Sequence, residues 1–141
     1  MKLYLDTSDL FKLFVEEEGS QAVEKLAAGA DLVAVSIVAY AEFRGSLARA
    51  RRAGRLPQEL YNDTLSVFER AWMTYSRIPV DERLASQSGE LAEKHFLRGF
   101  DAIHLASALT LQRELGDPVT FSSADGRLTA AASAEGLLVA S

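Results

Sequence analysis

The chain has 141 residues, 48% hydrophobic and 25% charged, a balance typical of one globular domain spanning residues 1–141. It contains no cysteine, which excludes disulfides and thiolate metal sites, and its net charge of -5 disfavours a protein that coats nucleic acid by bulk positive charge. A carboxylate at residue 6 comes too early for a signal peptide, and no apolar run approaches the roughly 18 residues of a membrane span. We therefore expect a cytoplasmic protein.

The predicted elements alternate between short strands and helices along the whole chain. The strands are short, mainly apolar runs, at 2–5, 32–35, 77–80, 119–122 and 137–140. The helices follow capping residues or end near glycines, at 10–17, 37–54, 57–75, 82–97, 101–115 and 125–136. Strands that alternate with helices predict an α/β fold, in which helices cover both faces of a parallel sheet.

Four acidic residues either follow a predicted strand or lie near the start of a predicted helix. They are Asp6, Glu42, Asp101 and Asp125. The ligand crevice of an open parallel sheet lies beyond the carboxyl ends of its strands, so we expect the four to meet at that edge. Ser36 is expected to cap the helix that carries Glu42, which would aim this side chain back toward the rim.

Carboxylates clustered in a cleft repel one another, so some would take up protons unless a cation joined them. A ligand set made only of oxygen suits a hard ion, Mg²⁺ or Mn²⁺. Each acid also has an ordinary explanation. Asp6 and Asp125 are plausible helix caps, Asp101 suits the first turn of its helix, and Glu42 could be a solvated helix residue.

The short motifs that carry these acids occur in the order seen in a known nuclease family. They are "LDTS" at 5–8, "AYAEF" at 39–43, "FDAIHLASA" at 100–108 and "FSSADGRL" at 121–128. Together they resemble the motifs of PIN-domain nucleases, and the chain length and spacing are most similar to the VapC-type toxins of toxin–antitoxin pairs. The resemblance implies a PIN-like, three-layer α/β/α fold around a parallel sheet of about five strands.

The same resemblance implies a function and a set of roles. The chain would be an Mg²⁺- or Mn²⁺-dependent endoribonuclease, with RNA as substrate and water as the attacking group. Ser8 matches a hydroxyl that supports the first aspartate, and Ser123 matches a small hydroxyl residue near the last, where the family more often has Thr. A small antitoxin protein and a homodimer are the implied partners. The catalytic and metal-binding quartet carried over from the family is Asp6, Glu42, Asp101 and Asp125.

Basic residues are concentrated in one acid-free segment, 44–55. One interpretation is a solvated helix face. The other is a surface that holds the RNA backbone beside the acidic site, which would let an acidic protein bind a polyanion. The candidate RNA-binding residues are Arg44, Arg49, Arg51 and Arg52, with Arg55 completing the segment.

The predicted helix 57–75 carries an aromatic-rich apolar face. Its members recur at intervals of three or four residues, as Tyr61, Leu65, Phe68, Trp72 and Tyr75. One interpretation places the whole face in the core. The other leaves part of it exposed for an antitoxin helix, with Tyr61, Phe68 and Trp72 as the contacts.

Three other ionisable residues have ordinary structural explanations. Asp9 is expected to be an ordinary first-turn acid, His104 a packed and hydrogen-bonded residue, and His95 part of an exposed helix end. A haloacid-dehalogenase phosphatase would need an acid where Ser8 stands, and a response regulator would need a lysine beyond Lys94. Two alternatives stay open: a housekeeping RNA-processing PIN nuclease, and a catalytically inactive PIN-like module that binds RNA or protein.

Overall fold

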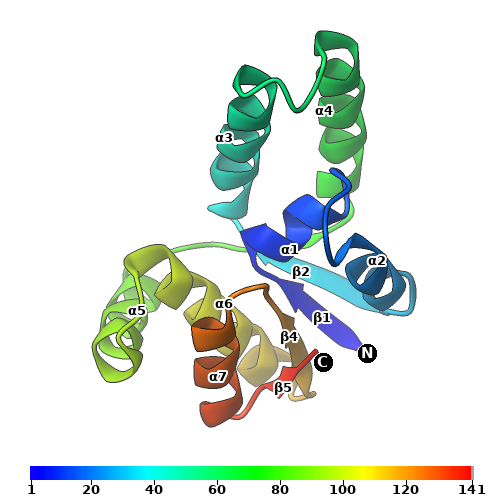
Figure 1. Ribbon diagram of the computed structural model, residues 1–141. Coiled ribbons are helices and arrows are strands. Elements are labelled where there is room, and N and C mark those ends of the chain that lie inside the picture. The colour runs from blue at the N-terminus through cyan, green and yellow to red at the C-terminus, as the bar shows by residue number, and fades with distance from the viewer. Residues whose placement is uncertain (141) are drawn as a thin grey trace.

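The computed structural model describes residues 1–140, whose strands form one sheet between two layers of helices (Figure 1). All neighbouring strands are parallel, in the order β3-β2-β1-β4-β5. The strands are β1 (Lys2–Leu5), β2 (Leu32–Ser36), β3 (Ser76–Ile78), β4 (Val119–Ser122) and β5 (Leu138–Val139). The order reverses at β1, which places a crevice at the carboxyl end of the central strand.

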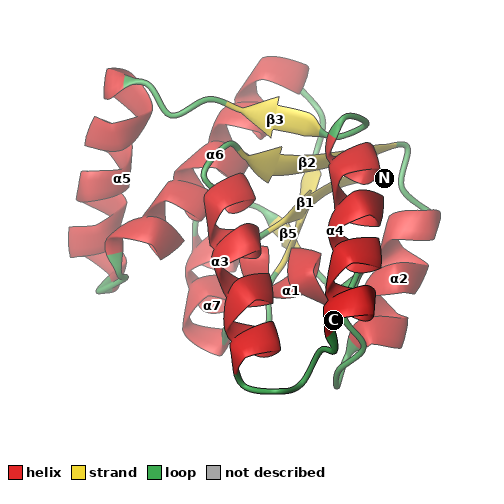
Figure 2. Ribbon diagram, turned by 90° about the horizontal axis from the view of Figure 1, so that it is seen from above, coloured by secondary structure: helices red, strands yellow, loops and turns green. Residues whose placement is uncertain are grey.

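Within residues 1–140, seven helices flank this sheet. They are α1 (Thr7–Lys12), α2 (Ser20–Ala28), α3 (Ala39–Arg52), α4 (Gln58–Trp72), α5 (Glu82–His95), α6 (Gly99–Leu115) and α7 (Gly126–Ala134). Figure 2 shows the strands between α5, α6 and α7 on one side and α1, α2 and α4 on the other. In Figure 1, α3 and α4 project beyond the sheet as a pair. No helix within residues 1–140 is long and apolar enough to cross a bilayer.

Side-chain alternation along the strands divides the core into two clusters. Leu3 and Leu5 of β1 face α1 to α4, where Phe43 and Phe68 stack with ring centroids 3.7 Å apart. Tyr4 faces the opposite layer and packs with α5 to α7. Successive strand residues point to opposite faces, so a strand buried on both sides is apolar throughout. The predicted three-layer α/β/α arrangement is therefore confirmed.

Local structure departs from the prediction at several element boundaries. The helix α2 was not expected; it follows Gly19, whose φ of 92° is readily adopted only by glycine. The helix expected at 10–17 is shorter and begins earlier, at Thr7. Ser36 does not cap α3, because a turn intervenes and the helix starts at Ala39 with Val38 at its N-cap. Pro57, expected inside its helix, lies at the N-cap of α4.

Candidate active site

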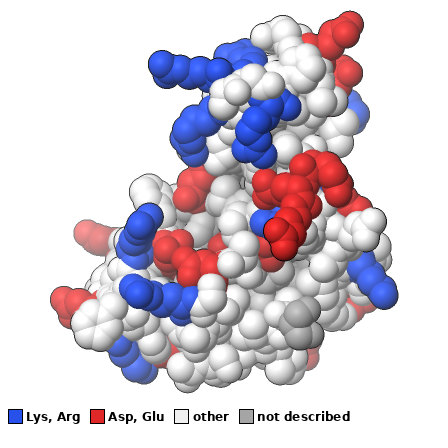
Figure 3. Space-filling view, in the orientation of Figure 1, with Lys and Arg blue, Asp and Glu red and all other residues white. Residues whose placement is uncertain are grey.

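The four predicted acids reach the same cleft from four separate elements. Asp6 directly follows β1, Glu42 lies in the first turn of α3, Asp101 lies in the first turn of α6, and Asp125 caps α7 after β4. All four line a cleft of about 910 Å³. Figure 3 shows acidic atoms where the α3–α4 projection meets the body of the molecule, with basic atoms above them.

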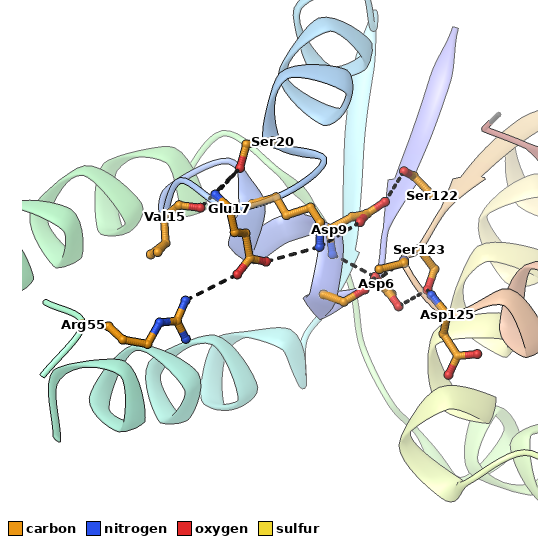
Figure 4. A network of polar contacts seen from close by, with 12 residues as sticks. Asp6, Asp9, Val15, Glu17, Ser20, Arg55, Ser122, Ser123 and Asp125 are labelled. Carbon is orange, nitrogen blue, oxygen red and sulfur yellow. Dashed lines mark hydrogen bonds and ion pairs between the residues drawn. The ribbon is translucent and has the colours of Figure 1, made fainter. Parts of the chain in front are cut away.

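Sheet register explains how Asp6 and Ser123 come together. Leu5 of β1 pairs with Ser122 of β4, so the next residue of each strand leaves the sheet beside the other. The Ser123 hydroxyl donates a hydrogen bond to Asp6 Oδ2, and the Ser8 hydroxyl donates to Asp6 Oδ1 at 2.7 Å. The Ser123 hydroxyl oxygen also accepts from the Asp125 backbone N–H at 3.0 Å (Figure 4).

Asp6 is nearly enclosed, with 4% of its surface exposed. Burial raises the pKa of its carboxyl group, and hydrogen bonds from Ser123 and Ser8 oppose that shift. Its Oδ1 also accepts the Asp9 backbone N–H at 3.1 Å, so Asp6 is the N-cap of α1 as well as a wall of the cleft. Capping and lining the cleft are therefore compatible roles for the same carboxylate.

Glu42 is held by two donors on a single oxygen. Its Oε1 accepts from the Thr7 hydroxyl at 2.6 Å and lies 2.8 Å from His104 Nε2. Burial raises the pKa of Glu42, but the contacts with His104 and Thr7 outweigh it, so the pKa is lowered overall. Thr7 belongs to the motif "LDTS" but was not predicted as a site residue. The prediction that His104 is packed and hydrogen-bonded is confirmed, since only 2% of it is exposed.

Asp101 and Asp125 carry the most open carboxylates of the cleft. Burial raises the pKa of Asp101, and the charges of Asp125 and Asp6 raise it further. Asp125 Oδ1 accepts from the backbone N–H groups of Arg127 and Leu128, at 2.9 and 3.2 Å, as a helix cap does. The negative charges of Asp125 and Asp6 therefore disfavour the ionised form of Asp101.

The donor set of the cleft fits a hard divalent cation. Its acidic side chains offer only carboxylate oxygens. The negative charges of neighbouring carboxylates disfavour the ionised form of Asp101, and a cation would neutralise those charges. Within residues 1–140, no three acidic or histidine side chains are arranged to hold an ion by themselves. That arrangement still suits Mg²⁺, which keeps several waters and is often held by one or two carboxylates together with substrate phosphates.

The basic segment 44–55 divides between two surfaces. Arg49 and Arg55 line the cleft. Arg44 instead faces α4, where it donates to the Tyr40 hydroxyl at 3.0 Å and lies 3.6 Å from Glu69 Oε1. The remaining two, Arg51 and Arg52, do not line the cleft either, and Arg51 lies 4.2 Å from the centroid of the Tyr61 ring. Of the four predicted RNA-binding residues, Arg49 therefore lies in the cleft, together with Arg55, and RNA binding by the arginines stays a prediction.

The aromatic face of α4 is mostly core. Phe68 is fully buried and Trp72 is 6% exposed, so the prediction that they form an exposed antitoxin surface is wrong. The reason is that α4 packs on α3 through stacked and edge-on rings, which enclose both side chains. Tyr61 is half-buried beneath Arg51. The exposed apolar residues of α4 are Leu60 and Val67.

Two further residues are more enclosed than expected. Asp9 lies in the first turn of α1, as predicted, but it is buried; it accepts from the Ser122 hydroxyl at 2.6 Å and ties α1 to β4 (Figure 4). His95 is largely covered, because its Nε2 lies 2.6 Å from Glu135 Oε2. His95 does not line the cleft, whereas His104 does. The cleft therefore lacks the second histidine that a metal-free mechanism with two histidines requires.

A parallel sheet between two helical layers, with acids beyond its carboxyl edge, is the arrangement expected of a PIN domain. The PIN domain family model matches residues 3–132. Two proteins of Mycobacterium tuberculosis, Ribonuclease VapC45 and Ribonuclease VapC49, are each 36% identical to the chain over 139 residues, covering 98% of it and 94% of the relative. The chain therefore belongs to the PIN-domain family, among its VapC-type members.

Solved structures agree on the fold. FitAcB from Neisseria gonorrhoeae superposes with a TM-score of 0.69 at 18% identity, covering 99% of this chain and 96% of its own. VapC20 of Mycobacterium tuberculosis, a toxin that cleaves the sarcin–ricin loop, superposes with a TM-score of 0.66 at 19% identity, covering 97% of both chains.

Proposed function

We propose that this protein is a divalent-metal-dependent endoribonuclease and the toxin of a toxin–antitoxin pair. The observation that carries the proposal is the convergence of Asp6, Glu42, Asp101 and Asp125, from four elements, on one cleft. Repulsion among acids serves no structural purpose, whereas it favours the binding of a cation. The two mycobacterial relatives named as VapC ribonucleases support RNA as the substrate.

Each part of the cleft has a role in this reaction. A bound Mg²⁺ or Mn²⁺ would activate water and stabilise negative charge on the phosphodiester. Asp6, fixed by Ser8 and Ser123, offers a rigid oxygen ligand in the cleft. Arg49 and Arg55 would bind RNA phosphates in the same cleft, and hydrolysis by water would leave a 5′-phosphate and a 3′-hydroxyl.

A small antitoxin and a second copy of the chain are the proposed partners, in the cytoplasm. Similar solved structures include a toxin–antitoxin complex from Klebsiella pneumoniae, with a TM-score of 0.61. Leu60 and Val67 are spaced seven residues apart on one exposed side of α4. This spacing suits contact with an amphipathic antitoxin helix, and replaces the buried aromatic residues as the proposed surface.

The test is cleavage of cellular RNA by purified protein in Mg²⁺ or Mn²⁺, with sequencing of the cut ends. We expect 5′-phosphate ends, loss of cutting in excess EDTA, and loss of cutting in Asp6→Asn. Asp63→Asn, on the exposed side of α4, is the matched control and should cut normally. Cleavage that persists in EDTA would overturn the metal mechanism, and no cleavage of any RNA would favour a binding module.

Toxicity is tested separately, by induced expression in a bacterial host. Growth arrest that is relieved by co-expression of a small neighbouring gene would identify a toxin. RNA cleavage without growth arrest would instead identify a housekeeping processing nuclease.

A further inference from the structure

We propose that His104 is a positioning residue, which orients the Glu42 carboxylate in the cleft through a hydrogen-bonded chain that starts at the Tyr4 hydroxyl. The inference rests on the proposed function, because it assigns His104 a part in the same reaction. His104 lines the cleft, but both of its ring nitrogens are used in contacts within the protein, so it acts through Glu42.

The chain of contacts runs from the sheet core to the cleft. Tyr4 of β1 is completely buried, and its hydroxyl lies 2.8 Å from His104 Nδ1. On the other side of the ring, His104 Nε2 lies 2.8 Å from Glu42 Oε1 and 3.2 Å from the Thr7 hydroxyl. Both ring nitrogens therefore have partners, as a buried imidazole requires.

The chemistry of the partners determines which atom donates and which accepts in each of these hydrogen bonds. A carboxylate oxygen can only accept, so Nε2 must carry the proton that points to Glu42. In a neutral imidazole Nδ1 is then an acceptor, and the Tyr4 hydroxyl donates to it. The carboxylate of Glu42 thus sets the tautomer of His104, and the Tyr4 hydroxyl completes the hydrogen bonding of the ring at Nδ1.

The hydrogen bonds from His104 and Thr7 leave the second carboxylate oxygen of Glu42, Oε2, available for the reaction. His104 and Thr7 both meet Oε1, and among residues 1–140 no hydrogen bond reaches Oε2. Glu42 lies in the first turn of α3, one of the two helices that project beyond the sheet (Figure 1). A flexible glutamate on such a helix needs an anchor, and His104 supplies one from α6, three residues after Asp101. The imidazole therefore fixes Glu42 relative to Asp101.

The alternative is that His104 only stabilises the fold, and paired variants separate the two roles. His104→Leu alone would remove the imidazole that the buried Tyr4 hydroxyl contacts, so it is combined with Tyr4→Phe, which removes that hydroxyl. His104→Gln keeps an N–H donor near the position of Nε2. Tyr4→Phe alone retains the imidazole beside Glu42, so it measures how much of the loss in the double variant comes from Tyr4.

We expect Tyr4→Phe/His104→Leu to fold and to lose about 10- to 100-fold in kcat with KM little changed, the usual effect of removing a partner of an active-site ligand. His104→Gln should recover most of the lost rate. A double variant that cuts RNA at the wild-type rate would overturn the proposal. So would a His104→Gln variant no more active than the double variant.

A second measurement is independent of activity. Long-range ¹H–¹⁵N NMR of histidine-labelled, metal-free protein should show His104 with protonated Nε2 and bare Nδ1, with the signal assigned by its loss in His104→Gln. A bare Nε2 would refute donation to Glu42, even if the double variant failed to fold. If the wild-type protein cut no RNA, the proposed function would fail, while the NMR result would still decide the hydrogen-bond assignment.

Discussion

Arginine side chains of α3 and of the turn that follows it should differ in their effect on RNA binding. Arg49 and Arg55 line the cleft, whereas Arg44 is held by Tyr40 and Glu69 on the side that faces α4. Arg55 also lies 3.6 Å from Glu17 Oε2, but an exposed ion pair of this kind is weak, so a phosphate can replace it. We therefore expect alanine at 49 or 55, but not at 44, to remove a phosphate contact.

The size of the effect follows from counterion release. Each phosphate contact on a single strand contributes about -0.7 to the slope of log K against log salt, so Arg49→Ala/Arg55→Ala should flatten the slope by about 1.4. Raising salt from roughly 50 to 200 mM should then shrink the affinity gap between wild type and the double variant by about 7-fold.

Fluorescence anisotropy with a labelled single-stranded RNA is the appropriate assay, across a series of KCl concentrations at constant Mg²⁺. All variants carry Asp101→Asn, so that the RNA stays intact and the acidic residues of the cleft are the same throughout. Arg44→Ala should reproduce the parent slope. The reasoning is refuted if the double variant keeps the parent slope, or if Arg44→Ala flattens it as much as either cleft substitution does.

Three further outcomes concern stability. Burial and neighbouring carboxylates raise the folded-state pKa of Asp101 above its unfolded value, so its ionised form destabilises the fold at neutral pH, and this penalty disappears as pH falls through the folded pKa. Asp101→Asn should therefore raise the melting temperature of metal-free protein at about pH 7 and leave it unchanged at about pH 3. Scanning calorimetry measures both values, and a lower melting temperature of the variant at neutral pH would contradict this reasoning. Phe68→Ala should cost about 3–5 kcal/mol in urea unfolding, whereas the exposed neighbour Val67→Ala should stay within about 0.5 kcal/mol; similar costs would contradict the burial of Phe68. Ser122→Ala removes the hydroxyl that donates to buried Asp9 and should cost about 1–3 kcal/mol in the same assay, and an unchanged unfolding midpoint would argue against that bond.

The order of elements was readable from the sequence because local patterns carry it. Apolar runs of strand length alternate with helical periodicity, and this alternation alone predicts a parallel sheet with two helical layers. The missed helix α2 shows the limit of that reasoning. Its nine residues are buried only at Ser20 and Val23, so its apolar pattern is weak, and packing against α1 supports it.

The positions of the acids were predictable for a geometric reason. In a parallel sheet every strand ends at the same edge, so residues that follow β1 and β4 must emerge together whatever the packing of the helices. Asp6 and Asp125 therefore meet at the cleft. The sequence also carried the family motifs, and the similarity to VapC ribonucleases agrees with them.

Only the tertiary structure decided which side chains of each helix face the cleft. The orientation of α3 about its axis places Arg49 in the cleft and Arg44 beside Glu69. The spacing of the arginines along the sequence does not predict this orientation. Likewise, the aromatic face of α4 could have been core or docking surface, and packing on α3 buried Phe68 and Trp72. The contact of Glu42 with His104 joins residues 62 positions apart. Such contacts depend on how whole helices pack against one another. The sequence alone determines the local periodicity from which each helix forms.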